Sequence, residues 1–178
     1  TDGTKIPVKI HVDKSGIPVF TSSEGGVGVR IRDVLPITPT GIQFLADQAA
    51  NSLNLYREIF GVDYPYGKLD LVNDPLGSFY GQSPSSLIYL GEGTFASQGM
   101  AGEFGGSNLS KFNREVVPHE VGHQWWGSLI PNHNNGNYWF VESLAEYSSA
   151  LYVEFESGKD DKAAYQDKVA DWRRFLLS

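Results

Sequence analysis

Two histidines with a glutamate between them form the pattern in this chain that points most directly to chemistry. They lie in the run His119-Glu120-Val121-Gly122-His123, which is an H-E-x-x-H motif. On a helix, residues four apart share one face about 6 Å apart, so both imidazoles can bind one zinc ion through Zn–N bonds of about 2.0–2.1 Å. The glutamate flanks the metal and can accept a proton from a metal-bound water. The motif therefore predicts a hydrolytic zinc site.

A third metal ligand is available after the second histidine. Eighteen residues separate His123 from Glu142. That length lets the first helix end near Gly127, a loop follow, and a second helix return antiparallel with Glu142 facing the histidines. Two histidines, one carboxylate and one water complete a four-coordinate catalytic zinc site. We expect one zinc ion per chain, whereas His11 and His133 are expected to lie outside the site.

Two neighbours of the predicted site leave alternatives open. Glu146 lies one turn after Glu142 on the same helix face, so it either hydrogen-bonds the outer nitrogen of a ligating histidine or is a solvated helix residue. Pro118 directly precedes the motif, and proline is tolerated only in the first turn of a helix. The motif helix therefore either begins near Pro118 or kinks there, and both histidines stay one turn apart in either case.

The zinc motif with its spaced Glu142 resembles that of the aminopeptidase N family, which includes leukotriene hydrolase. The resemblance extends over roughly residues 35–160. Three further segments carry it: His123-Gln124-Trp125-Trp126-Gly127 is similar to the family's H-Q-W-F-G, Trp139–Tyr147 to its W-L-N-E-G-F-A-E-Y, and Tyr64–Val72 to the stretch that leads into its substrate-binding strand.

This resemblance implies the fold, the activity and the roles of the site residues. The fold would be a thermolysin-like catalytic domain of the α+β class, with a mixed sheet followed by helices. Glu120 would be the general base, and His119, His123 and Glu142 would hold the zinc. The activity would be zinc-dependent hydrolysis of peptide bonds, of the aminopeptidase type, with peptides as substrates.

One departure from the family concerns recognition of the substrate. The family carries G-x-M-E-N on a strand edge, and its glutamate binds the free amino group of the substrate. The corresponding stretch begins at Gly81, and Pro84 falls near the place of that glutamate. Glu92 and Glu103 are the nearest substitutes, although loop glutamates belong more commonly to an acidic surface. The loss keeps open a zinc endopeptidase or a peptidase of another specificity.

A second departure concerns the stabilisation of the transition state. The family's tyrosine for this role would lie beyond Ser178, and Tyr147, Tyr152 and Tyr165 are expected to be packing residues. A non-catalytic, peptidase-like binding module therefore stays open as a further alternative.

The elements that must position these residues can be read from the hydrophobic pattern. We expect strands at 5–12, 27–32, 68–72 and 86–90, a helix at 40–60 that stops at Gly61, a loop at 91–110, and helices at about 112–127, 139–156 and 161–177. Residues 1–34 would be the last strands of a preceding β domain or the start of the catalytic domain. Residues 35–178 would be a catalytic domain that is incomplete at its C-terminus, so missing flanking domains are expected.

Composition limits the classes of partner and metal site. The chain has 178 residues, a formal net charge of −7 and no cysteine. The acidic balance argues against a nucleic-acid partner, and the absence of cysteine excludes disulfides and thiolate ligands. No apolar run approaches the roughly 18 residues of a membrane helix. The sequence leaves the cellular compartment open.

Overall fold

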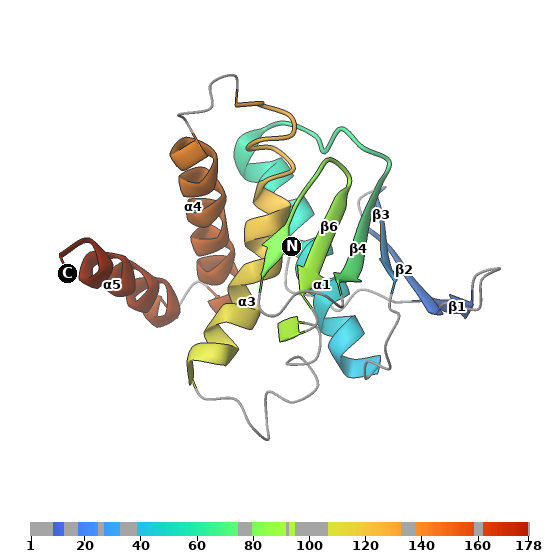
Figure 1. Cartoon of the computed structure of the whole chain (residues 1–178), viewed down its shortest axis with the longest axis horizontal. Coiled ribbons are helices and arrows are strands. Elements are labelled where there is room, and N and C mark those ends of the chain that lie inside the picture. Colours follow the sequence, from blue (N-terminus) through green and yellow to red (C-terminus); the bar gives the residue numbers. More distant parts are fainter. Residues whose placement is uncertain are drawn as a thin grey trace.

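The described strands form one mixed sheet (Figure 1). The computed structural model describes residues 9–12, 18–24, 27–32, 39–74, 80–91, 93–94, 107–132, 138–158 and 162–177. In spatial order the strands are β1 (Lys9–Val12), β2 (Pro18–Glu24), β3 (Val27–Arg32), β4 (Lys68–Asp74), β6 (Leu87–Gly91) and β5 (Gly81–Gln82). The first three pair antiparallel, β4 is parallel to β3 and β6, and β5 is antiparallel to β6.

Three of the four predicted strands, those expected at 27–32, 68–72 and 86–90, lie at or close to their expected positions. The remaining strand was expected at 5–12, and the part of it that the structure describes is β1. The sequence did not predict β2 or β5. The β2 segment has Thr21, Ser22 and Ser23 where an alternating apolar face would be needed, and β5 has only two residues, too few for any pattern. Pairing between β3 and β4 joins the strands before residue 34 to the same sheet as those after it.

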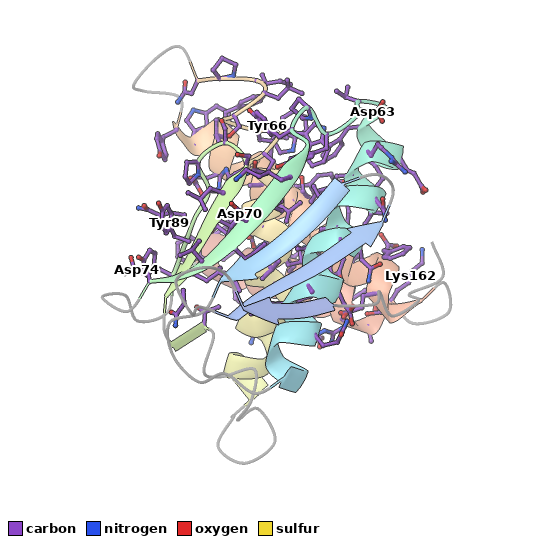
Figure 2. All side chains as sticks on the ribbon, turned by 90° about the vertical axis from the view of Figure 1, so that its right-hand side faces the viewer. Asp63, Tyr66, Asp70, Asp74, Tyr89 and Lys162 are labelled. Carbon is purple, nitrogen blue, oxygen red and sulfur yellow. The ribbon has the colours of Figure 1, made fainter. Side chains whose placement is uncertain are left out.

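The described part of the chain also contains four long helices: α1 (Pro39–Phe60), α3 (Ser107–Gly122), α4 (Tyr138–Ser157) and α5 (Ala163–Leu177). Figure 2 shows the sheet in front of the helices, which lie behind one of its faces. The predictions for α1, α4 and α5 are confirmed to within two residues. Helix α1 also stops as predicted, because Gly61 adopts a φ of 66° and its N–H donates to the Arg57 carbonyl. Among the described residues, no helix is long and apolar enough to cross a bilayer.

The helix that carries the zinc motif is displaced from its predicted position of about 112–127. It begins at Ser107, inside the expected loop, and ends at Gly122. Beyond it, the N–H groups of Gln124 and Trp125 bond three residues back, and Gly127 turns the chain with a φ of 113°. Only glycine adopts that conformation readily, so the helix cannot continue to 127.

The hydrophobic core lies between the sheet and the helices α1 and α3. On α1, an apolar stripe at three- and four-residue spacing faces inward, with Leu45, Ala49, Leu53 and Tyr56 fully or nearly fully buried. Strands β4 and β6, helix α3 and the turn after it supply the rest of the core through Leu69, Leu71, Ile88, Leu90, Val117, Val121 and Trp125. This core fixes the orientation of α3 and therefore the direction in which its histidines point.

Helix α3 continues through Pro118, so the alternative in which it begins there is wrong. Proline has no N–H, which leaves the carbonyl of Arg114, four residues earlier, without its helical partner. The Gln48 side chain of α1 donates to that carbonyl at 3.1 Å. One turn on, the Tyr56 hydroxyl donates to the Pro118 carbonyl at 3.0 Å. A side chain of α1 thus replaces the helical hydrogen bond that is lost because Pro118 has no N–H.

We predict that Gln48→Leu destabilises the fold by about 1–3 kcal/mol, because the part-buried carbonyl of Arg114 loses its donor. The measurement is the midpoint of urea unfolding. Gln43→Leu is the matched control on the same helix; it removes a partly exposed hydrogen bond to Asp47, worth about 0.2–0.5 kcal/mol. Equal midpoints for the two variants would contradict the role given to Gln48.

Candidate metal centre and active site

The predicted metal ligands converge at the end of α3 and the beginning of α4. The His119 and His123 Nε2 atoms lie 3.1 Å apart. The Glu142 Oε2 atom lies 3.4 Å from each of them. A backbone bond from the His123 N–H to the His119 carbonyl carries the helical geometry one residue past α3, so both rings share one face. Among the described residues, no other group of histidines and acids has this metal-binding arrangement.

The spacing of these three atoms fits a tetrahedral zinc ion. With bonds of about 2.0–2.1 Å, two ligand atoms of a tetrahedral site lie about 3.3 Å apart. The outer nitrogens support the same conclusion. His119 Nδ1 lies 3.1 Å from the Glu146 carboxylate, and His123 Nδ1 lies 3.1 Å from the Trp126 carbonyl. Both are acceptors, so each Nδ1 donates its proton outward and each Nε2 is free to bind a metal.

Small residues allow the two helices to approach closely enough for this convergence. A methyl group added at Gly122 would lie 3.2 Å from the Ala145 Cα atom and 3.3 Å from the Ser148 Cβ atom of α4. The backbone of α3 therefore rests almost directly on α4 at this point. Figure 1 shows the two helices side by side. The contact lies within one turn of both His119 and Glu142, and it sets the distance between them.

Glu146 hydrogen-bonds the outer nitrogen of a predicted ligand histidine, which is one of the two alternatives that the sequence left open; it is not a solvated helix residue. Its Oε2 atom accepts the hydrogen bond from His119 Nδ1. Its Oε1 atom contacts Lys168 Nζ at 2.8 Å and accepts a bond from Trp172 Nε1 at 3.1 Å. Burial favours the neutral carboxyl, but these three donors outweigh it and lower the pKa of Glu146 to about 2. Glu146 is therefore ionised at neutral pH.

The pKa values of the two histidines shift in opposite directions. Burial lowers the pKa of His119, but the Glu146 hydrogen bond and the neighbouring carboxylates reverse the effect, and the net shift is upward. Burial and the nearby His119 lower the pKa of His123. A histidine binds a metal only after the coordinating nitrogen has lost its proton, so metal and proton compete at this pair.

Glu120, the predicted general base, lies in the same pocket and is 5% exposed. Burial, helped by the charge of Glu142 and opposed by His119, raises its pKa to about 7. The backbone of Gly81 in β5 passes so close that any side chain there would overlap the Glu120 carboxylate. Sequence reasoning missed this role of Gly81; the available signal was the glycine that opens the family's G-x-M-E-N.

A buried glutamine, also missed from the sequence, ties the edge strand to the motif helix. Gln124 donates to the Ser83 hydroxyl at 2.5 Å and to the Pro84 carbonyl at 3.0 Å, and accepts from the Ser86 N–H at 2.8 Å. Ser83 in turn donates to the Glu120 carbonyl at 2.7 Å. These bonds hold the segment after β5 beside Glu120, the predicted general base.

The two predicted ligand histidines and Glu120 line a pocket of about 840 Å³. Its other walls are residues 81–85, the turn after α3, and the start of α4 with Glu142. Pro84 lies in the wall, so the residue near the place of the family's amine-binding glutamate faces the same space. Among the described residues, the carboxylates that line this pocket are Glu120 and Glu142.

The remaining sequence candidates fall elsewhere. Glu92, Glu103 and His133 lie outside the described residues, and His11 belongs to β1, at the far end of the strand order from β5. Tyr152 is buried in the core, as expected for a packing residue. Tyr147 is 48% exposed, so its assignment to packing is wrong: its position on α4 turns away from both α3 and the core.

Comparison with known proteins connects this site to a family. Residues 44–174 match the model of the peptidase family M1 domain. Aminopeptidase 2 of Candida albicans is 34% identical over 109 residues, covering 60% of this chain and 11% of that protein. Aminopeptidase M1-D of Oryza sativa subsp. japonica is 34% identical over 118 residues, covering 63% and 12%. Human endoplasmic reticulum aminopeptidase 2 is 27% identical over 152 residues, covering 84% and 15%.

The matched curated relatives are much longer than this chain, which spans about 11–16% of their length. The family match confirms the resemblance to the aminopeptidase N family.

We predict that His123→Ala abolishes tight binding of zinc, because it removes one of three converging ligands. His133→Ala, which removes a histidine outside the predicted site, leaves binding unchanged. The measurement is the zinc content of each purified variant after dialysis, with one zinc per chain expected for the wild type. Equal content in the two variants would reject the assignment of ligands.

Proposed function

This chain belongs to peptidase family M1, and from that membership we propose that it forms the zinc centre of an aminopeptidase-type metallopeptidase. His119, His123 and Glu142 hold the ion, and Glu120 is the general base. The observation that carries the proposal is the triangle of ligand atoms, with sides of 3.1, 3.4 and 3.4 Å. Its edges have the length that a tetrahedral zinc ion requires.

The proposed reaction is hydrolysis of a peptide bond. When bound, zinc lowers the pKa of a water to about 7 and polarises the scissile carbonyl. Glu120 accepts a proton from the attacking water at its carboxylate and passes it to the nitrogen of the leaving amine. Its burial supports this exchange, because a carboxyl whose pKa is raised to about 7 both accepts and releases a proton near neutral pH.

The surrounding residues hold this carboxylate in place. Gly81 leaves room for the Glu120 side chain, and the Ser83 hydroxyl bonds its backbone carbonyl. His119 and His123 direct their outer protons to Glu146 and to the Trp126 carbonyl, which fixes the planes of both rings. The walls of the pocket would accommodate an extended peptide beside β5.

The fold and domain organisation enter the same proposal. Residues 35–178 would be part of a thermolysin-like catalytic domain. The segment 1–34 would belong to the start of that domain rather than to a preceding one, since β3 pairs with β4 in a single sheet. Further domains of the whole protein are expected from the length of the relatives.

A second candidate, a peptidase that does not depend on a free N-terminus, has one specific observation in its favour. Pro84 lies in the pocket wall near the position where the family carries its amine-binding glutamate. A proline side chain offers no hydrogen-bond acceptor, and a neighbouring serine offers only an uncharged one. The two candidates share the zinc chemistry and differ in how the end of the substrate is recognised.

The test of catalysis is Glu120→Gln in the full-length protein. Glutamine keeps the shape of the side chain but cannot accept the proton, so hydrolysis of peptides should fall by about 10²–10⁴-fold while zinc is retained. Glu154→Gln, a substitution on α4 at a carboxylate that pairs with Lys162, is the matched control. Removal of zinc with a chelator should abolish activity and its return should restore it. Undiminished hydrolysis by Glu120→Gln would overturn the proposal.

The test of specificity compares a peptide with a free amine and its acetylated twin. A buried carboxylate paired with the substrate ammonium discriminates by about 3–5 kcal/mol. Because Pro84 stands near that position, we predict that the ratio of kcat/KM for the two peptides stays well below about 10³. A ratio above that value would show that another carboxylate binds the amine, and Glu92 and Glu103 would then be the residues to substitute.

A further inference from the structure

Helix α5 is attached to the rest of the molecule in an unusual way. Its one buried residue among those described is a lysine, Lys168, which is 5% exposed, whereas Phe175, Leu176 and Leu177 are largely exposed. Lysine is almost never fully buried unless its charge is paired. An apolar residue would anchor the helix at a lower cost of desolvation. The buried charge of Lys168 therefore indicates that this residue does more than attach α5 to the other helices.

The buried ammonium bridges two carboxylates from different helices. Lys168 Nζ lies 2.7 Å from Glu115 Oε2 on α3 and 2.8 Å from Glu146 Oε1 on α4. It also lies 5.5 Å from the centre of the Trp172 ring, one turn further along α5. Glu115 is one helical turn before His119, so the lysine contacts both the helix that carries this histidine and the carboxylate that hydrogen-bonds it.

The two oxygens of the Glu146 carboxylate have different partners, because the donors from α5 contact only one of them. Lys168 and Trp172 both contact Oε1, whereas Oε2 accepts the bond from His119 Nδ1. With Oε1 held by two donors, the carboxylate cannot rotate without breaking both contacts. Oε2 is therefore kept at the outer nitrogen of the histidine, and the His119 Nε2 atom is kept toward His123 and Glu142.

We propose that Lys168 and Trp172 are positioning residues of the metal centre, which act through Glu146 to orient His119 and so raise its affinity for zinc. This inference rests on the proposed function, because it assumes that His119 binds the metal. It assigns α5, which lines no part of the described pocket, an effect on that site that passes through Glu146.

The experiment measures the dissociation constant of zinc by competition with a chromophoric chelator in the full-length protein. Loss of a group that orients a ligating histidine typically weakens metal binding 10- to 100-fold. Lys168→Met, which keeps most of the length of the side chain and removes its charge, should weaken binding by about 10-fold. Trp172→Phe, which removes the indole N–H donor and keeps a smaller aromatic ring, should cause a smaller loss. The d–d absorption of the cobalt-substituted protein should change in both variants.

A double-mutant cycle separates positioning from simple support of the fold. If Lys168 acts through Glu146, then Lys168→Met added to Glu146→Gln should weaken zinc binding by no more than about twofold beyond Glu146→Gln alone. Lys162→Met is the matched control: Lys162 lies at the periphery of the molecule (Figure 2), its side chain is 63% exposed, and its pair with Glu154 is remote from the site. It should bind zinc as the wild type does.

Each outcome decides between the two proposals. If His123→Ala loses zinc but Lys168→Met and Trp172→Phe bind it with wild-type affinity and an unchanged cobalt spectrum, the positioning role is wrong and the metal site stands. Additive losses in the cycle would also reject it, since Lys168 would then act without Glu146. If His123→Ala binds zinc normally, the ligand assignment fails and this inference falls with it. Should Lys168→Met fail to fold, Trp172→Phe and its combination with Glu146→Gln distinguish the same alternatives.

Discussion

The contact between α3 and α4 at Gly122 is the constraint on which the site depends. Two of the proposed ligands lie at or just beyond the end of one helix and the third lies near the start of the other, so the distance between the helix axes governs how closely Glu142 approaches the histidines. A methyl group at Gly122 would press on the backbone and on Ser148 of α4. Any enlargement of residue 122 would separate His119 from Glu142, and a few tenths of an ångström matter for bonds of about 2 Å.

Sequence reasoning was most accurate where a local pattern and the tertiary structure agree. The spacing of His119, His123 and Glu142 required only a helix, a turn and a second helix, and the structure brings these three side chains together. The stripe on α1 from Leu45 to Tyr56 likewise has a period that packing against a core retains. Strand β4 was recognisable because Leu69 and Leu71 flank a polar residue in an alternating pattern, and both leucines are buried in the structure.

The parts that sequence reasoning missed depend on partners distant in the chain. Neither the length of α3 nor its passage through Pro118 follows from local preference, because the compensating donor, Gln48, lies 66 residues from the carbonyl it bonds. The same holds for Gln124, whose partners include Ser83, Pro84 and Ser86, about 40 residues earlier in the chain. It also holds for Lys168, which would ordinarily be assigned to the solvated face of α5. Polar residues that are buried by such distant contacts do not contribute to the hydrophobic periodicity of the sequence, so a pattern-based prediction cannot find them.

The hydrogen bond between Gln48 and the Arg114 carbonyl has a consequence for how this protein can vary. The bond satisfies a carbonyl that is free only because residue 118 has no N–H. In a relative with alanine at 118, the helix would bond that carbonyl itself, and a polar side chain at 48 would become a buried group without an acceptor. The two positions, on different helices, should therefore change together. Proline at 118 should occur with a hydrogen-bond donor at 48, and any other residue at 118 should occur with an apolar residue at 48.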